Sequence, residues 1–157
     1  MGEEITALEL LQQVDIFQGI PDLILEELLE TAETHAFEKG DPIFREGTPG
    51  SGMFLVIGGA VELTKAVTRG SGQRLALLDR GQIFGELSLF DDLPRSAGAT
   101  AFVTCSLLFF PAGPFHDLLD DRRAFAPQLM RNLVKKLALR LRDADEEIRE
   151  LSRAGAH

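Results

Sequence analysis

Between Thr34 and Pro111 the sequence consists of short β-prone runs separated by glycine, proline and aspartate. The runs include HAFEKGDPIF, MFLVIGGAVELTKA and RLALLDRGQIF. Many short strands with frequent turns are typical of a closed barrel or a jelly roll. We therefore expect a jelly-roll β-barrel over residues 34–111.

A helical pattern precedes this region. Apolar residues at helical spacing run from Leu8 to Phe17 and again from Leu23 to Leu29, and the helix-breaking segment 19–21 separates them. The pattern predicts two short helices within residues 1–33.

A second helical pattern occupies residues 112–157, with a short segment around Phe115 and a long one from Ala124 to about Arg153. A chain of 157 residues has the length of one ordinary domain and can bury a core without a metal or a disulfide. We therefore interpret residues 1–157 as a single α+β, mainly β, domain with short N-terminal helices and a long C-terminal helix.

The long helical segment carries apolar residues at alternating spacings of four and three, the a/d pattern of a coiled coil. These seam residues are Met130, Val134, Leu137, Leu141, Ala144, Ile148 and Leu151. The seam predicts a homodimer through this helix. The alternative is that the helix packs on its own domain, for which Leu129 and Leu133 offer a second apolar stripe, and both contacts can coexist.

The formal net charge of −9 restricts the kinds of partner. Proteins that bind nucleic acid by neutralising phosphates usually present a basic face, so we expect no DNA binding by this chain alone. No apolar run is long enough to span a membrane, and the acidic amino terminus lacks the basic region of a signal peptide. We expect a cytoplasmic protein without membrane association, in which any anionic ligand is held by a few local donors.

The reactive side chains suggest no catalytic centre. His35, His116 and His157 have no metal-ligand spacing with one another or with Cys105, and no nucleophile–base pair is evident. We therefore expect no metal site and no enzymatic activity. Cys105 is the only cysteine, so an intramolecular disulfide is impossible, and its apolar neighbours predict a buried thiol.

The segment with the most chemical information is residues 84–97, FGELSLFDDLPRSA. A glycine before the short apolar turn Glu86–Phe90 predicts a helix amino terminus whose free amides favour an anion. Arg95 can grip a phosphate through paired hydrogen bonds beside the Ser96 hydroxyl, and Glu86 can accept hydrogen bonds from sugar hydroxyls. These residues suit a ligand with ribose and phosphate, but they are equally consistent with a solvated Glu86–Arg95 ion pair around a loop.

The same segment closely resembles the phosphate-binding cassette of cyclic nucleotide-binding domains. The resemblance rests on the runs FGELSL and PRSA and on the eight residues between Glu86 and Arg95. The spacing is similar to that of protein kinase A regulatory subunits, and the Arg-Ser-Ala ending is similar to that of the catabolite activator protein. The similarity extends to FEKGDPIFREG, to GAVEL and to the order of the helices, and it covers roughly residues 8–150.

The resemblance implies a cyclic nucleotide ligand, with cyclic AMP preferred over cyclic GMP. It places the cyclic phosphate on Arg95 and the amides of the Glu86 turn, and the ribose 2′-hydroxyl on Glu86. Gly85 would allow close backbone approach, and Ser96 would face the phosphate or the base. The candidate ligand-binding residues are Gly85, Glu86, Leu87, Ser88, Arg95, Ser96 and Ala97 in the cassette, with Arg140, Ala144 and Asp145 on the long helix.

For the base, the resemblance implies a position under the long helix, near Ala144 and Asp145 if Pro127 aligns with the proline that opens this helix in the catabolite activator protein. If Asp145 points at the base, its carboxylate can accept hydrogen bonds from guanine N1 and N2 but would meet the N1 lone pair of adenine. The alternative is an ordinary solvated charge in the acidic run 143–147.

The expected function is therefore that of a cyclic AMP sensor, which couples ligand binding to the C-terminal helix and to a protein partner that the sequence does not identify. The alternatives are a cyclic GMP-binding domain and a structural dimer module with an unoccupied pocket. Catabolite-activator-like members continue into a helix-turn-helix, whereas this sequence stops at His157, so we expect a stand-alone domain.

Overall fold

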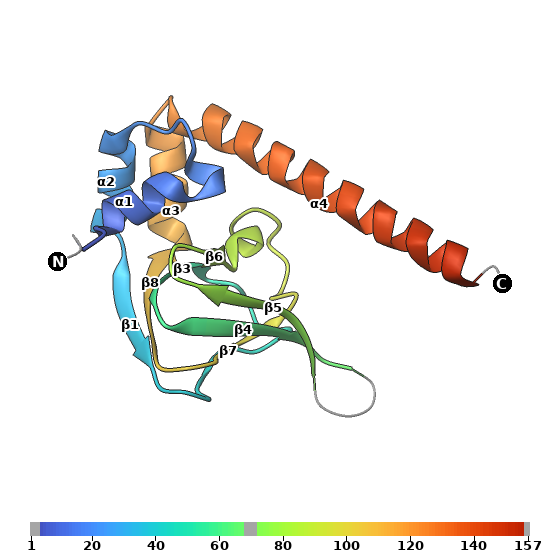
Figure 1. The fold of residues 1–157 in the computed structure, drawn as a ribbon. Helices are drawn as coiled ribbons and strands as arrows, with labels where there is room; N and C mark the ends of the chain where they lie inside the picture. Colours follow the sequence, from blue (N-terminus) through green and yellow to red (C-terminus); the bar gives the residue numbers. More distant parts are fainter. Residues whose placement is uncertain (1–3, 68–71, 156–157) are drawn as a thin grey trace.

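The computed structural model describes residues 4–67 and 72–155, and the centre of the fold is a pair of facing antiparallel sheets (Figure 1). The strands are β1 (Glu33–Phe37), β2 (Pro42–Phe44), β3 (Gly52–Gly58), β4 (Ala60–Lys65), β5 (Gln73–Asp79), β6 (Ile83–Phe84), β7 (Gly98–Ala101) and β8 (Cys105–Pro111). One sheet has the order β1-β8-β3-β6 and the other has the order β2-β7-β4-β5. This arrangement is that of an eight-stranded, two-sheet jelly roll.

The predicted mainly β roll is confirmed, and of the two forms that the sequence left open, a closed barrel or a jelly roll, the closed barrel is not the one found. Each four-stranded sheet keeps two edge strands, so the sheets face each other without joining. At one edge of each sheet the strand is very short: β6 has two residues and β2 has three. Strands of this length offer too few backbone groups to hydrogen-bond across to the other sheet and close the barrel.

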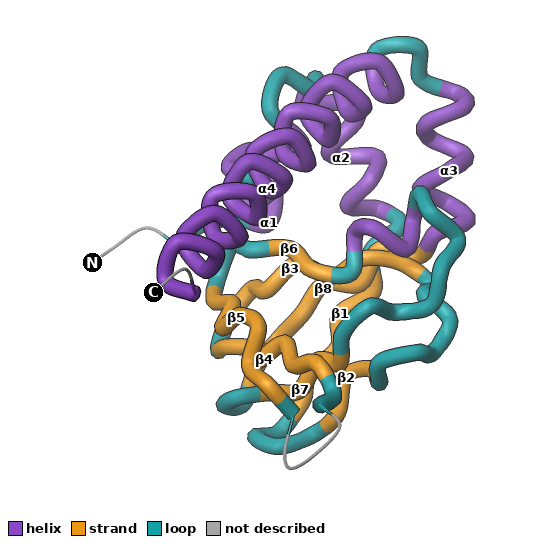
Figure 2. Tube along the Cα trace, turned by 90° about the vertical axis from the view of Figure 1, so that its right-hand side faces the viewer, coloured by secondary structure: helices purple, strands orange, loops and turns teal. Residues whose placement is uncertain are grey.

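The helices gather at one end of the sandwich and then extend beyond it (Figure 2). They are α1 (Ala7–Gln13), α2 (Asp22–Glu30), α3 (Ala112–Asp121) and α4 (Phe125–Gly155), with the 3₁₀ turns η1 (Asp15–Phe17) and η2 (Glu86–Leu89). The two short N-terminal helices and the long C-terminal one therefore agree with the sequence-based expectation. Residues 1–3 and 156–157, which belong to the segments 1–33 and 112–157 expected to contain these helices, lie outside the described residues, and His157 is among them.

Two apolar clusters explain why β3 reads as a continuous hydrophobic run. Phe54 and Val56 point into the cluster between the sheets, whereas Met53 and Leu55 point into the cluster formed with the helices. Because successive side chains of a strand point to opposite faces, a strand covered on both faces is apolar at every position. The β3 sheet is thus the middle layer between the helices and the second sheet.

The first part of α4 packs on the N-terminal segment, through the second apolar stripe that the sequence offered. Leu129 and Leu133 are buried, and the Asn132 amide donates hydrogen bonds of 2.8 Å to the carbonyl oxygens of Ile16 and Gln18. Residues 141–155 are all exposed. The helix therefore has a docked half and a projecting half, which Figure 1 shows extending away from the rest of the protein.

No helix in residues 4–67 and 72–155 combines the length and the apolar character that crossing a membrane would require.

Candidate ligand-binding site

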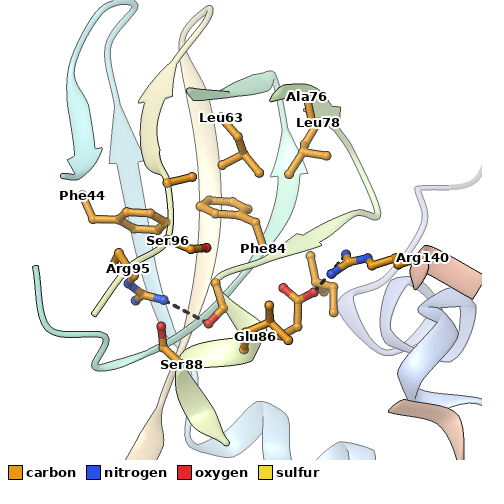
Figure 3. A pocket seen from close by; sticks show the side chains of 14 residues that line it. Phe44, Leu63, Ala76, Leu78, Phe84, Glu86, Ser88, Arg95, Ser96 and Arg140 are labelled. Carbon is orange, nitrogen blue, oxygen red and sulfur yellow. Dashed lines mark hydrogen bonds and ion pairs between the residues drawn. The ribbon is translucent and has the colours of Figure 1, made fainter. Parts of the chain in front are cut away.

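A cavity of about 200 Å³ lies between the second sheet, the η2 turn and α4 (Figure 3). One wall is charged or polar and consists of the cassette residues and one residue of α4. The other wall is apolar and is formed by strands of the sandwich. The lining residues are Gly85, Glu86, Leu87, Ser88, Arg95, Ser96, Ala97 and Arg140 on the polar side, and Phe44, Leu63, Ala76, Leu78, Ile83 and Phe84 on the apolar side.

Arg95 is a buried cation held by neutral groups. It is 5% exposed, and its Nη1 and Nη2 atoms donate hydrogen bonds to the carbonyl oxygens of Gly85 (2.9 Å) and Gly52 (2.8 Å). Its guanidinium carbon lies 4.3 Å from the centre of the Phe44 ring, a cation–π distance. Within the described part of the chain its Nε atom has no hydrogen-bond partner.

Burial lowers the pKa of the Arg95 guanidinium from its ordinary value, and the charge of Glu86 opposes that shift. An arginine remains protonated in proteins at neutral pH, so this site holds a buried positive charge. No carboxylate within salt-bridge distance of it is found in residues 4–67 and 72–155. A buried charge without a charged partner is costly, and a bound anion would supply that partner.

The local backbone fixes the position of Arg95. The Arg95 N–H donates to the Thr48 carbonyl and the Arg95 carbonyl accepts from the Gly47 N–H, both at 2.8 Å. Gly85 has a φ of +77°, and a Cβ atom there would lie 2.5 Å from Nη1 of Arg95. Glycine at this position both permits the left-handed backbone and leaves room for the guanidinium.

Glu86 is the second buried charge of the site, and its partners come from α4. It is 5% exposed, and its Oε1 atom lies 3.3 Å from Lys136 Nζ and 3.4 Å from Arg140 Nη2. The solvated Glu86–Arg95 ion pair that the sequence left open is therefore wrong, since both side chains are buried and each has other partners. The carboxylate instead faces the cavity from the side opposite Arg95 (Figure 3).

The structure brings most of the candidate residues together. All seven cassette candidates line the cavity, and Arg140 reaches it from α4. Ala144 and Asp145 do not line it and are exposed, so their expected place beside the base stays a prediction. The reason they lie outside it is geometric: α4 passes the cavity at Arg140, and the next turn of the helix has already moved beyond it.

Sequence reasoning missed two groups of residues at this site. Leu63, Ala76 and Leu78 form part of the apolar wall. The alternation of Val61 and Leu63 with polar residues in β4 could have indicated the orientation of Leu63, whereas β5 is apolar at each of residues 75–78 and gives no such signal. Lys136 was also missed, and no local pattern marks it, because its partners Asp15 and Glu86 are distant in the sequence.

In the described ranges no group of three or more histidine, cysteine, aspartate or glutamate side chains is placed to hold a metal ion. Cys105 is buried, as its sequence context predicts. Burial raises the pKa of its thiol, and the nearby Asp41 carboxylate adds to that increase.

Comparison with known proteins identifies the family. Residues 34–122 match the family described as cyclic nucleotide-binding domain, which is more than half of the chain. The fold and the charged cavity are therefore those of a ligand-binding module, and the chain belongs to the cyclic nucleotide-binding domain family.

Several proteins are similar to this chain. The Cyclic AMP receptor protein of Thermus thermophilus is 36% identical over 137 residues, which cover 87% of this chain and 62% of that protein. The crystal structure of the Thermus thermophilus Catabolite Activator Protein superimposes with a TM-score of 0.76 at 34% identity, over 88% of this chain and 63% of that one. Human cGMP-dependent protein kinase 2 is 34% identical over 93 residues, 58% of this chain but only 12% of the kinase.

Proposed function

We propose that this protein senses a cyclic nucleotide, cyclic AMP in preference to cyclic GMP. The observation that carries the proposal is the buried guanidinium of Arg95, which borders a cavity and is held by neutral acceptors. A cyclic phosphate is an anion of suitable size for this place, and membership of the family supports the same ligand class.

Some N–H groups of the Arg95 guanidinium are available to donate hydrogen bonds to a phosphate. A guanidinium carries five N–H groups, and two of them are used on the carbonyls of Gly85 and Gly52. The remaining three, including the unpartnered Nε–H, can donate to phosphate oxygens as charge-assisted hydrogen bonds. We propose that Ser88 and Ser96 complete the polar wall around the phosphate.

The two walls suit the other parts of a nucleotide. Glu86 is an acceptor for a ribose hydroxyl, and the apolar wall of Leu63, Ala76 and Leu78 can cover the face of a base. We rank cyclic AMP first because the relative named for cyclic AMP matches 87% of this chain, against 58% for the relative named for cyclic GMP. Asp145, the residue that would favour guanine, is exposed and does not line the cavity of the single chain, which also supports this ranking.

We propose that the nucleotide is bound and not converted. Glu86, the only carboxylate that lines the described cavity, is paired with two cations and suits the role of an acceptor better than that of a general base. Incubation with cyclic AMP followed by chromatography tests this point, since accumulation of AMP in proportion to protein concentration would contradict it.

We further propose that the projecting half of α4 pairs with a second copy of the chain. Its seam residues Leu141, Ile148 and Leu151 are each more than 60% exposed and continue a seven-residue repeat. Because Lys136 and Arg140 of α4 contact Glu86, ligand binding at Glu86 can change the position of this helix. The helix can in turn change its contact with a protein partner. A signal requires that the two arrangements of the helix bind the nucleotide with different affinities.

Calorimetric titration of the chain with cyclic AMP, cyclic GMP and 5′-AMP tests the proposed function. We expect saturable binding of both cyclic nucleotides, tighter for cyclic AMP, and much weaker binding of 5′-AMP, whose phosphate carries more charge and is free to rotate. Absence of heat with either cyclic nucleotide at high micromolar concentration would favour the structural dimer module.

A further inference from the structure

Lys136 joins three segments that are far apart in the sequence. It lies on α4, its Nζ atom is 3.3 Å from Glu86 Oε1 on η2, and the same atom is 3.4 Å from Asp15 Oδ1 on η1. Its side chain is only 16% exposed. The ammonium group therefore sits between a carboxylate of the cavity and a carboxylate of the N-terminal segment.

Lys136 is the better shielded of the two cations on Glu86. The side chain of Arg140 is 53% exposed, against 16% for Lys136. Water screens an exposed ion pair strongly, whereas a pair withdrawn from water interacts more strongly at the same distance. Since a buried carboxylate needs a compensating charge, Lys136 supplies the larger part of that compensation.

The contacts leave one carboxylate oxygen for a ligand. Both cations make their shortest contact with Glu86 at Oε1, and among the described residues the hydrogen bond found on this carboxylate is also at Oε1, so Oε2 is the oxygen assigned to a sugar hydroxyl. A cation on Oε1 keeps the carboxylate ionised and limits its rotation, which makes Oε2 a better oriented acceptor. Ligand and lysine can thus contact Glu86 at the same time.

We infer that Lys136 is a positioning residue for the ribose: it acts through Glu86, and Asp15 holds it in place. This assignment rests on the proposed function, because it concerns how the same cavity recognises the 2′-hydroxyl of a cyclic nucleotide. It also connects recognition of the ribose to the docked half of α4 and to η1.

The test is a thermodynamic cycle between the lysine and the 2′-hydroxyl, with cyclic AMP and 2′-deoxy cyclic AMP as ligands. We expect Lys136→Met to reduce the affinity for cyclic AMP about tenfold, which is the order expected for the loss of a hydrogen bond to a charged group. The same variant should change the affinity for 2′-deoxy cyclic AMP by less than about twofold, because that ligand makes no hydrogen bond to Glu86. Lys136→Arg should restore most of the affinity for cyclic AMP.

Lys135→Met is the matched control, since Lys135 is an exposed lysine on the same helix that does not line the cavity. It should bind both ligands like the unaltered chain. If Lys136→Met does not fold, as judged by circular dichroism, Lys136→Gln and Asp15→Asn are measured with the same two ligands. Asp15→Asn should also reduce the affinity for cyclic AMP more than the affinity for 2′-deoxy cyclic AMP.

The outcomes separate this assignment from the proposed function. Equal losses for the two ligands would show that Lys136 supports the structure in general, and would overturn the assignment while the cavity remains a nucleotide site. Failure of the unaltered chain to bind cyclic AMP would overturn both.

Discussion

The η2 end of the cavity and the projecting half of α4 depart from the usual distribution of residues in opposite ways. At the cavity, Glu86 and Arg95 are charged and buried; along α4, Leu141 and Leu151 are apolar and exposed. Buried charges and exposed apolar rows are the informative exceptions in a soluble protein. Each indicates a partner, an anionic ligand in the first case and an apolar surface in the second.

The two regions differ in what holds them when that partner is absent. Arg95 and Glu86 are fixed by several contacts within the chain, so the cavity is preformed. Binding of a ligand therefore requires little free energy to order the side chains of the site. Residues 141–155 are all exposed. The stability of the projecting half of α4 therefore depends on the helix propensity of its own residues and on the surface that covers its seam. Four changes test this contrast.

The largest effect is expected at the seam. Leu137→Asp combined with Leu141→Asp would place four carboxylates in a pair of helices, and each costs roughly 1 kcal/mol or more when it is desolvated. A dimer should therefore be weakened by about 4 kcal/mol or more, which gives monomers at micromolar concentration in light scattering. Leu139→Asp, an exposed position outside the seam, should leave the dimer intact. If the unaltered chain is a monomer at micromolar concentration, the proposed pairing of α4 is wrong and the exposed seam indicates no partner of this kind.

Arg95→Ala should reduce the affinity for cyclic AMP by roughly 2 to 5 kcal/mol, about 30-fold to several thousand-fold, because the phosphate loses its buried charged partner. Arg74→Ala is the control, since Arg74 is an arginine of the sandwich that pairs with Glu62 outside the cavity. Calorimetry of both variants measures the difference. Unchanged affinity in a folded Arg95→Ala protein would mean that the phosphate lies elsewhere.

Glu86→Ala should have a smaller effect, on the order of 1.5 to 3 kcal/mol, because its hydrogen bond goes to a sugar hydroxyl and not to a phosphate. Glu62→Ala removes a paired carboxylate of β4 that does not line the cavity and should bind normally. If Glu86→Ala weakened cyclic AMP more than Arg95→Ala, the order of the two contacts would be reversed.

The smallest effect is expected at Asp145. Because this residue is exposed and outside the cavity, Asp145→Ala should change the ratio of cyclic AMP to cyclic GMP affinity by less than about twofold, as for most surface substitutions. Competition of the two nucleotides on one protein measures this ratio. A preference for cyclic GMP that disappears in the variant would show that Asp145 reads the base, and would imply that α4 of a second copy brings it there.

Much of the fold and the cassette could be predicted from the sequence, because their signals are local. Short β-prone runs between turn residues predict the strands, and a seven-residue apolar repeat predicts α4 and its exposed seam. The run from Gly85 to Ala97 contains the glycine, the carboxylate and the guanidinium in one segment, and its resemblance to the phosphate-binding cassette implied their common site. The sequence did not decide between a closed barrel and an open roll, because closure depends on whether edge strands pair, which the β-prone runs do not encode.

Only the tertiary structure decided the partners of the buried charges Arg95 and Glu86, and the point at which α4 leaves the cavity. Arg95 is held by the carbonyl of Gly52, 43 residues away, and Glu86 by Arg140, 54 residues away. Asp15 and Lys136 meet across 121 residues. The same geometry brings Arg140 to the cavity and leaves Ala144 and Asp145 outside it. Periodicity states which face of a helix a residue occupies, but the packing of Leu129, Asn132 and Leu133 sets the direction of the axis, and that direction decides which turn of the helix meets the site.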